Sequence, residues 1–595
     1  TQTQTQTQTQ TQTQTQTQTQ TQTQTQTQTV EDSRFRDFEE TYPSAPRVLA
    51  DAIADGCMIH FCNDNSPNSL KKTLNLATYP TDNSPNLLKK HPIWRVIADF
   101  LWSFQYKRLT LHIQKQAFME KIIGRKQESR LLNSYLQSGR AEFVVLYGRR
   151  RVGKTFLVRE LLSKHFAFYV TGLSPVDNEQ GADKKYQLLN FFTELKLRGF
   201  AGEIPTSWME AFGQLRSYLE SLDQTKRQVI FIDEMPWMDT PKSGFLVAFE
   251  AFWNGWASGR SNLMLIVCGS VTSWIIKKLL KNKGGLHNRT THEMYLAPFT
   301  LAECEKLAES NGVKMSRYDY LNAYMVLGGI PFYWLQLQSR LSLAQNIDSL
   351  FFATKRAPMS GEFEKLMHSL FRKPENYIKI LVVLSKKRGG LTRDELAKAI
   401  KKESGGALTK ILEDLEDSDF ITSYVPLKSN GCTYYKLTDL FTMFYLRFVQ
   451  SGENTDPSFW SHSLNTPEHN TWAGLSFETV CSLHLEQIKK ALSINGVLCN
   501  HHSFVTKSNK GAQIDLVLDR ADNVTNLCEM KFASAEYAIK SKDEENLRNK
   551  MARLKECIPP KKAVHLTMVT TYGITRNVHS SIVQSEVVMN DLFED

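Results

Sequence analysis

The sequence has no apolar run of membrane-spanning length, and no signal-peptide pattern opens it. Its nine cysteines are scattered without a single C-x-x-C pair, which argues against zinc ribbons and against a disulfide framework. The basic excess is mild, a formal net charge of +10 over 595 residues, and it permits a nucleic-acid partner without demanding one. We therefore expect a cytoplasmic chain of roughly three or four domains.

The first 118 residues contain little that could form a folded core. Residues 1–29 alternate Thr and Gln, a low-complexity pattern that predicts disorder. Residues 30–118 include a near-duplication, DNSPNSLKK at 64–72 and DNSPNLLKK at 82–90, and predict a poorly ordered extension without assigned function. One interpretation is an over-extended reading frame, in which the natural protein starts at Met119. The other is a genuine N-terminal extension.

The strongest pattern is the stretch FVVLYGRRRVGKTFLVRE at 143–160. Its apolar start predicts a strand buried in a parallel sheet, and its end has the apolar spacing of a helix. Between them stands G-x-x-x-x-G-K-T, a loop whose backbone N–H groups and following helix N-terminus surround a phosphate. Lys154 supplies a cation and Thr155 a ligand for Mg²⁺. The predicted nucleotide-binding residues are Gly148, Arg149, Arg150, Arg151, Val152, Gly153, Lys154, Thr155 and Phe156.

A second stretch, VIFIDEMPWM from Val229, places two carboxylates at the end of an apolar strand. Open α/β sheets bind ligands at the carboxyl ends of their strands, so an acid ending a strand beside the phosphate-loop strand can meet Mg²⁺. We predict that Asp233 holds this ion, directly or through water. Glu234 is placed to orient or deprotonate the attacking water, which indicates hydrolysis of the nucleotide rather than binding alone.

Two further residues are catalytic candidates. Ser270 follows the predicted strand 263–268, where a polar side chain can contact the γ-phosphate or the attacking water; the alternative is a strand-ending Gly-Ser turn. Arg289 precedes a strand-like stretch and could stabilise transition-state charge in cis or from a neighbouring subunit; the alternative is a surface salt bridge. The basic cluster at 277–283 is more typical of a solvated helix face than of a phosphate contact.

The rest of the chain divides into smaller predicted units. The helix predicted at 407–415, third in its unit, is acidic together with its exit, so we favour protein contacts over DNA reading for that unit. The aromatic stretch DLFTMFYLRFV at 439–449 is expected to be buried between domains. The predicted domains are a P-loop ATPase core at 119–299, a helical lid at 300–371, a winged helix at 372–450, a polar linker at 451–470 and a nuclease-like domain at 471–595.

The last unit contains a second group of charged residues. Asp515 and Glu529 lie on two strands predicted to form a hairpin, and Lys531 shares the face of Glu529 because strand side chains alternate. Glu478, on a preceding helix, could complete the group. Two carboxylates with a lysine can hold Mg²⁺ and lower the pKa of an attacking water, which suits phosphodiester hydrolysis. The alternative is that these charges decorate solvated strand faces.

These motifs together resemble the archaeal-type P-loop ATPases, a prokaryotic branch near the AAA+ and STAND groups. The residues after the winged helix resemble a C-terminal domain often attached to these ATPases and considered related to PD-(D/E)xK nucleases. The resemblance implies nuclease-like roles for Glu478, Asp515, Glu529 and Lys531, although Gln513-Ile-Asp stands where that superfamily often has Pro-Asp. The matching stretches of the ATPase part are IGR at 123–125, YGRRRVGKT at 147–155, FIDEMPW at 231–237, CGS at 268–270 and GGIP at 328–331.

We therefore predict an α/β fold, with an AAA+-like parallel-sheet P-loop NTPase core, a helical lid, a winged helix and a restriction-endonuclease-like α/β domain at the C-terminal end. The expected cofactors are ATP and Mg²⁺, the expected partners are DNA or another protein, and self-association is compatible with this family. The predicted function is Mg²⁺-dependent ATP hydrolysis coupled to the winged-helix and nuclease-like modules. The alternatives are an ATP-gated DNA nuclease and a nucleotide-switch regulator with little turnover.

Overall fold

The computed structural model describes residues 122–174, 183–281, 284–286, 288–353, 357–371, 373–401, 405–427, 431–450, 456–505 and 511–594. The predictions made for residues 1–29 and 30–118 concern parts of the chain outside these ranges. Among the described residues, no helix combines the length and the apolar character needed to cross a membrane.

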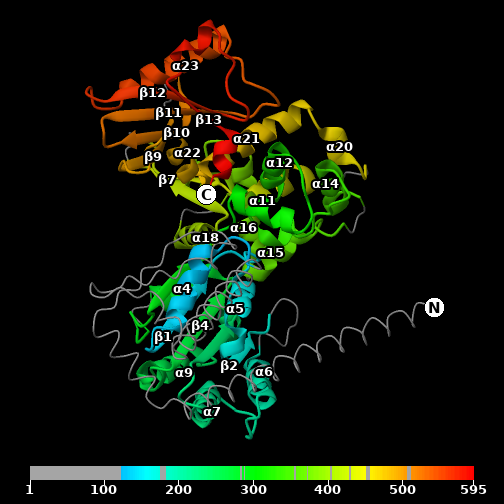
Figure 1. The fold of residues 1–595 in the computed structure, drawn as a ribbon, viewed down its shortest axis with the longest axis vertical. Coiled ribbons are helices and arrows are strands. Elements are labelled where there is room, and N and C mark those ends of the chain that lie inside the picture. Colours follow the sequence, from blue (N-terminus) through cyan, green and yellow to red (C-terminus); the bar gives the residue numbers. More distant parts are fainter. Residues whose placement is uncertain are drawn as a thin grey trace, which may run out of the picture. The chain divides into compact units, whose positions relative to one another are not determined.

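A five-stranded parallel sheet carries the predicted phosphate loop at the carboxyl end of β1 (Figure 1). The strands follow the spatial order β2-β3-β4-β1-β5. Every residue of β3 and β4 is buried, which suits their nearly continuous apolar sequences in a sheet covered on both faces. The strands are β1 (Glu142–Tyr147), β2 (Phe166–Thr171), β3 (Gln228–Asp233), β4 (Leu263–Gly269) and β5 (His292–Tyr295).

Strand β4 lies between β1 and β3 and pairs with both of them. The prediction that the acidic strand lies directly beside the phosphate-loop strand is therefore wrong. The three strands are parallel, so their carboxyl ends still lie at one edge of the sheet, where α/β sheets bind ligands. Asp233 ends β3 at this edge.

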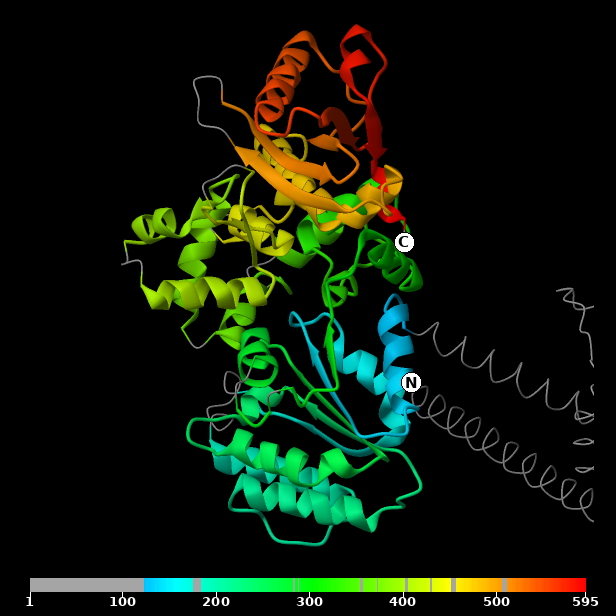
Figure 2. The same ribbon diagram turned by 90° about the vertical axis from the view of Figure 1, so that its left-hand side faces the viewer.

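Helices cover both faces of this sheet (Figure 2). Side chains of β1 alternate between the two faces: Val144 and Leu146 belong to one buried cluster, and Phe143 and Val145 belong to the other. The covering helices are α4 (Lys126–Leu136) and α5 (Lys154–Leu162) on the first face, and α6 (Lys184–Leu197), α7 (Trp208–Ser221) and α9 (Phe245–Gly255) on the second.

A region of helices follows β5 and extends the first of these clusters. Capping boxes at Thr300 and Ser342 begin α11 and α14, and Pro331 begins the short α13. The helices are α11 (Leu301–Ser310), α12 (Arg317–Leu327), α13 (Pro331–Trp334), α14 (Leu343–Phe351) and α15 (Glu362–Leu370).

The next unit contains three helices and a small antiparallel sheet of order β6-β8-β7. A capping box from Thr392 to Glu395 begins α17. The elements, in chain order, are α16 (Pro374–Ser385), β6 (Leu391–Thr392), α17 (Arg393–Ala399), α18 (Gly406–Asp417), β7 (Ile421–Tyr424) and β8 (Tyr434–Leu437).

The aromatic stretch after β8 is buried, as predicted, and Phe444 is 0% exposed. The ring of Phe444 lies edge-on to that of Trp460, which is 3% exposed. The linker predicted at 451–470 is therefore wrong for its described part, because Trp460 anchors that segment in the core. These elements are α19 (Leu440–Phe444), a π-helical segment (Tyr445–Val449) and α20 (Phe459–Ser463).

The last unit is a mixed five-stranded sheet, of order β13-β12-β11-β10-β9, with helices on both faces. Strands β9, β10 and β11 are antiparallel, whereas β11, β12 and β13 are parallel. One face of this last sheet shares a continuous apolar core with the first sheet and the helical region. These units therefore do not have separate cores. The elements are α21 (Pro467–Leu483), α22 (Leu485–Ala491), β9 (Cys499–Val505), β10 (Gln513–Arg520), β11 (Val524–Lys531), α23 (Ser541–Lys555), β12 (Ala563–Thr570) and β13 (Ser585–Val588).

Candidate nucleotide-binding site

The predicted phosphate loop connects β1 to the N-terminus of α5. Gly148 and Gly153 have φ values of 139° and 94°, which residues with a Cβ atom rarely adopt. A Cβ at Gly148 would also lie 2.5 Å from the carbonyl oxygen of Leu296. These glycines therefore allow the tight path that turns the loop into α5.

Lys154 is the first residue of α5 and is 5% exposed. Its Nζ donates hydrogen bonds to the carbonyl oxygens of Gly148 and Arg149, at 2.8 and 2.9 Å. Burial lowers the pKa of Lys154, while the carboxylates of Glu234 and Asp233 oppose this shift. The amine is therefore held inside the loop, where a phosphate would meet it.

Thr155 and Asp233 join α5 to the tip of β3. The Thr155 hydroxyl donates to Asp233 Oδ2 at 2.9 Å, and the thiol of Cys268 donates to the other carboxylate oxygen. Burial raises the pKa of Asp233, and the nearby charge of Glu234 adds to this rise. A hydroxyl and a carboxylate oxygen this close together are ligands of the type that Mg²⁺ prefers. The predicted metal ligands therefore fit the ion.

Ser270 and Glu234 form a second polar contact at the same edge. Both oxygens of the Glu234 carboxylate accept hydrogen bonds from Ser270, one from its hydroxyl and one from its backbone N–H at 2.9 Å. Glu234 itself has a φ of 47°, an unusual conformation for a residue with a side chain. Ser270 thus contacts the predicted base directly, a relation that the sequence does not reveal.

The side chain of Arg149 is buried, at 3% exposed. It forms a two-pronged salt bridge with Asp439, in which Nη2 lies 2.8 Å from Oδ2, and its guanidinium lies 4.9 Å from the ring of Phe420. Asp439 also caps α19 by accepting from the backbone N–H of Thr442 at 3.0 Å. Burial opposes the charge of Arg149, yet Asp439 keeps its pKa above the ordinary value.

The next two arginines also contact neighbouring elements. Arg151 forms a salt bridge with Glu362 of α15 and stacks on the ring of Phe332, 4.1 Å from its centroid. The guanidinium of Arg150 lies 6.0 Å from the ring of Trp237. The side chains of Arg149 and Arg151 are both engaged in salt bridges with other elements. For these two residues, the predicted contact with nucleotide is therefore limited to their backbone N–H groups.

The last residue predicted in the loop, Phe156, is 53% exposed on the first turn of α5. Sequence reasoning gave no role to Arg125, which is 6% exposed. Its Nη2 donates to the carbonyl oxygens of Ala297 and Val152, at 2.6 and 3.3 Å. Arg125 therefore links the phosphate loop to the segment that follows β5. The IGR stretch contains this residue, but the stretch does not show which loop its side chain reaches.

Arg289 is exposed and lies at the far end of the first sheet. Strand β5 places Tyr295 opposite Tyr147, and Thr291 donates its N–H to the carbonyl of Phe143 near the start of β1. Arg289 precedes Tyr295 by six positions (295 − 289), roughly 20 Å of extended chain. The predicted contact with a γ-phosphate in cis is therefore wrong, and contact from a neighbouring subunit stays a prediction.

Comparison with known proteins agrees with this geometry. Residues 123–337 match a family described as an ATPase domain predominantly from Archaea. This segment is therefore similar in sequence to that ATPase domain. The chain is also 24% identical, over 381 residues, to Uncharacterized protein MJECL04 of Methanocaldococcus jannaschii; the match covers 62% of this chain and 78% of that protein.

Two solved structures are similar to the chain. The Walker-type ATPase PABY2304 of Pyrococcus abyssi is 19% identical, with a TM-score of 0.41, over 55% of this chain and 97% of that one. The ORC2 protein of Aeropyrum pernix, solved as ADPNP–ADP complexes, is 13% identical, with a TM-score of 0.34, over 56% of this chain and 95% of that one.

The acidic helix α18 packs against the domain that contains the first sheet. Lys277 Nζ lies 2.9 Å from Asp414 Oδ1 and 3.2 Å from Glu413 Oε2. The hydroxyl of Tyr295 donates to Asp419 Oδ2 at 2.7 Å. We favoured packing over DNA reading for α18, and packing requires contacts of this kind. The basic cluster, expected on a solvated helix face, instead contributes Lys277 to ion pairs.

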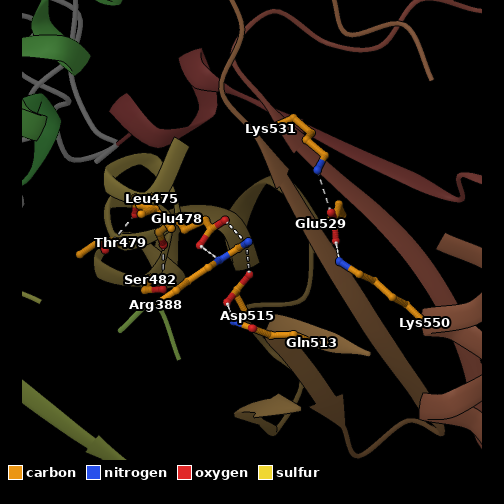
Figure 3. A network of polar contacts seen from close by, with 10 residues as sticks. All are labelled: Arg388, Leu475, Glu478, Thr479, Ser482, Gln513, Asp515, Glu529, Lys531 and Lys550. Atoms are coloured by element: carbon orange, nitrogen blue, oxygen red, sulfur yellow. Dashed lines mark hydrogen bonds and ion pairs between the residues drawn. The ribbon is translucent and has the colours of Figure 1, made fainter. Parts of the chain in front are cut away.

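The C-terminal carboxylates predicted to hold a metal are divided between two sites (Figure 3). Arg388, from the loop between α16 and β6, forms a two-pronged salt bridge with Glu478 of α21. Its Nη2 also lies 2.9 Å from Asp515 Oδ2 on β10. The guanidinium therefore joins these two carboxylates, in the place where a shared cation would have to bind.

Glu529 and Lys531 lie apart from Arg388 and its two carboxylate partners (Figure 3). Lys531 Nζ lies 2.9 Å from Glu529 Oε1, and Lys550 of α23 lies 2.7 Å from Oε2. Lysines thus neutralise Glu529 within the protein. The described residues contain no group of three His, Cys, Asp or Glu side chains able to hold a metal ion. The predicted convergence of the three carboxylates is therefore wrong.

An irregularity in β10 explains this separation. The pairing of β10 with β9 shifts register between Ile514 and Val517, and both of these side chains pack in the cluster that contains α23. Leu516 lies in the cluster that contains α21. In a regular strand, Ile514 and Val517 would point to opposite faces, so the bulge turns the residues between them. Asp515 therefore faces α21, while Glu529 faces α23.

Replacing Glu478 with Gln is expected to make stability less dependent on pH. Burial and the charge of Asp515 raise the pKa of Glu478 from 4.5 to about 7, although Arg388 opposes the shift. The folded protein therefore holds this proton more tightly than the unfolded chain does, and stability falls as the pH rises from about 4.5 to about 7. The melting temperature of Glu478→Gln relative to wild type should rise across this range in thermal unfolding.

Glu468→Gln provides the matched control, because Glu468 lies on the same helix but is 52% exposed. Its melting temperature relative to wild type should stay nearly constant with pH. If the difference in melting temperature between Glu478→Gln and wild type were also independent of pH, it would contradict the tighter proton binding of Glu478 in the folded protein.

Proposed function

We propose that the chain is a Mg²⁺-dependent ATP hydrolase that couples its nucleotide state to a winged-helix module, residues 374–437, and to the C-terminal α/β module. The observation that carries the proposal is the convergence of three groups at one edge of the first sheet. These groups are the enclosed Lys154 amine, the Thr155–Asp233 oxygen pair and the Glu234–Ser270 contact. Together they supply the parts needed for phosphoryl transfer to water.

The loop residues bind and orient the triphosphate. Backbone N–H groups of the loop and the N-terminus of α5 face the phosphates, and Lys154 exchanges its two carbonyl acceptors for phosphate oxygens. Thr155 and Asp233 would hold Mg²⁺. When bound there, the ion neutralises charge on the β- and γ-phosphate oxygens.

Glu234 accepts the proton of the attacking water in this proposal. Ser270 occupies both of its carboxylate oxygens, so it fixes the direction in which the base points. A base must lie within hydrogen-bond reach of the proton that it removes. In this proposal Ser270 is thus a positioning residue, in addition to the contact with the γ-phosphate or the attacking water that the sequence suggests.

Coupling to the winged-helix module would run through the side chains that leave the loop. Arg149 reaches Asp439, at the point where β8 ends and α19 begins, and Arg151 reaches Glu362 on α15. The helix–strand–helix–helix–hairpin order, with a sheet of order β6-β8-β7, supports the winged-helix assignment. Any shift of the loop on nucleotide exchange would therefore be transmitted to both elements.

Replacing Lys154 with Ala tests the proposal directly. We expect kcat for ATP hydrolysis to fall by about 10²–10³-fold, because the variant loses a preorganised cation that stabilises charge on the transferring phosphate. Steady-state phosphate release in the presence of Mg²⁺ measures the change. Lys196→Ala, an exposed lysine on α6, is the control and should retain wild-type turnover.

Wild-type turnover in the Lys154→Ala variant would contradict the assignment of this loop as the catalytic site. A wild-type chain that releases one phosphate and then retains ADP would instead be a nucleotide switch. Stimulation of turnover by DNA would identify the partner to which the cycle responds.

A further inference from the structure

A cleft lies between the β7/β8 hairpin of the winged-helix module and the C-terminal module. It consists of two hollows of about 630 and 400 Å³, which share Arg388, Lys436 and Thr479 in their walls. The larger hollow is bounded by β7, β9 and β10, and the smaller one by α16 and α21. Both modules therefore contribute to one continuous concave surface, which we call the basic cleft.

Positive charge predominates in the walls of the basic cleft. Five cationic side chains line it, against the two carboxylates of Glu478 and Asp515, and Arg388 already pairs with both carboxylates. Within the part of the chain that the structure describes, the exposed Lys386 and Lys387 have no ion-pair partner. The cations are Lys386, Lys387, Arg388, Lys436 and Arg447.

Neutral hydrogen-bonding groups lie among apolar side chains in the remaining wall. Hydroxyl groups predominate on the side of the hairpin, and His501 and His502 of β9 line the opposite side. Hydroxyls and cations together are the side chains that most often contact phosphate and sugar in nucleic-acid complexes. The hydroxyl-bearing residues include Thr422, Ser423, Thr438, Thr479 and Ser503.

The helix that most often reads DNA in such a module is engaged elsewhere. Asp414 of α18 is 6% exposed and lies against Lys277 of the ATPase domain, and Glu413 contacts the same lysine. An acidic and docked α18 cannot approach phosphates favourably. The basic cleft, in contrast, is open and has the charge that a phosphate backbone requires.

We propose that the basic cleft binds the sugar-phosphate backbone of a nucleic-acid strand. Lys386 and Lys387 would contact phosphates at its rim, and the hydroxyl groups would contact the backbone inside it. The inference goes beyond the proposed ATP hydrolysis, because none of the residues in the cleft walls belongs to the phosphate loop. Binding can therefore be measured on the full chain without nucleotide.

Fluorescence anisotropy with labelled single-stranded and duplex oligonucleotides provides the test, at salt concentrations from about 50 to 200 mM. The double variant Lys386→Glu/Lys387→Glu should lose at least tenfold in affinity for the form that binds. If both lysines contact phosphates, the slope of log affinity against log salt should fall by roughly 1.4 for a single strand or 1.8 for a duplex.

Lys184→Glu/Lys185→Glu is the charge-matched control, since both residues lie at the start of α6, outside the cleft walls. It should keep wild-type affinity, and both double variants should keep wild-type melting temperatures and basal ATP turnover. Equal loss in the two variants would overturn the proposal, because only net charge would then matter. Equally tight competition by polyglutamate of matched charge would also overturn it, in favour of an acidic protein partner.

Discussion

Replacing Asp439 with Ala is expected to lower the free energy of unfolding by about 3–5 kcal/mol, because it leaves a buried arginine without its partner. Arg149 and Asp439 are 3% and 5% exposed, so water cannot replace the lost carboxylate easily. Burial alone disfavours the charged guanidinium, and the carboxylate is what keeps its pKa high. The same change also removes the N-cap of α19, because Asp439 accepts from the N–H of Thr442.

Urea unfolding of the variant, followed by tryptophan fluorescence, measures this loss. Asp183→Ala separates the two contributions, because Asp183 caps α6 through Lys185 N–H without a buried ion pair. We expect the control to lose about 0.5–2 kcal/mol, the ordinary cost of an N-cap. Equal losses in the two variants would mean that the salt bridge contributes nothing beyond the cap.

A double variant gives a second check. Arg149→Met combined with Asp439→Leu removes both charges and fills similar volume, so it should recover most of the stability lost in Asp439→Ala. Failure to recover would indicate that the pair is needed for the backbone path of the loop itself. In either case, the result measures how strongly the predicted phosphate loop is coupled to the segment that follows β8.

The candidate nucleotide site was predictable because its loop residues are contiguous in the sequence. The loop from Gly148 to Thr155 is a single stretch between a buried strand and a helix, and its backbone conformation follows from its glycines. Asp233 could be placed at the sheet edge because an apolar run ends there. The contact of Ser270 with Glu234 could not be predicted, since it depends on β4 lying between β1 and β3.

Long-range partners account for most of what sequence reasoning missed. Arg149 and Asp439 are 290 positions apart, and no local pattern distinguishes that aspartate from an ordinary helix cap. Arg388 stands in a basic loop, where the sequence suggests only a solvated charge. The bulge beside Asp515 has no signature either, yet it changes the face of the sheet to which this carboxylate points.

The C-terminal module illustrates the same limit. Spacing correctly placed Asp515 and Glu529 on paired strands, but regular alternation was assumed between them. The actual strand irregularity gives each carboxylate its own cationic partner, Arg388 in one case and two lysines in the other. Charge pairing inside the protein thus takes the place of the metal site that the motif suggested.

Replacing Glu234 with Gln should produce the largest loss of activity. We expect kcat for ATP hydrolysis to fall by about 10²–10⁴-fold, because an amide cannot accept the proton of the attacking water. The amide oxygen of Gln can still accept from Ser270, so the loop and the sheet edge should remain folded. Phosphate release and the binding of a fluorescent ATP analogue, measured on the same preparation, separate the chemical step from binding.

Binding should change little in Glu234→Gln, whereas Lys154→Ala should weaken both binding and turnover, because Lys154, unlike Glu234, is placed to contact the phosphates. Glu203→Gln, an exposed residue of the same domain, should behave as wild type. Ser270→Ala keeps the base and the backbone hydrogen bond to it, but it removes the hydroxyl that holds the other carboxylate oxygen. It should therefore lower kcat while leaving KM nearly unchanged. If Glu234→Gln hydrolyses ATP at the wild-type rate, the proton acceptor is another group, and the contact with Ser270 serves only to hold the tip of β4 against β3.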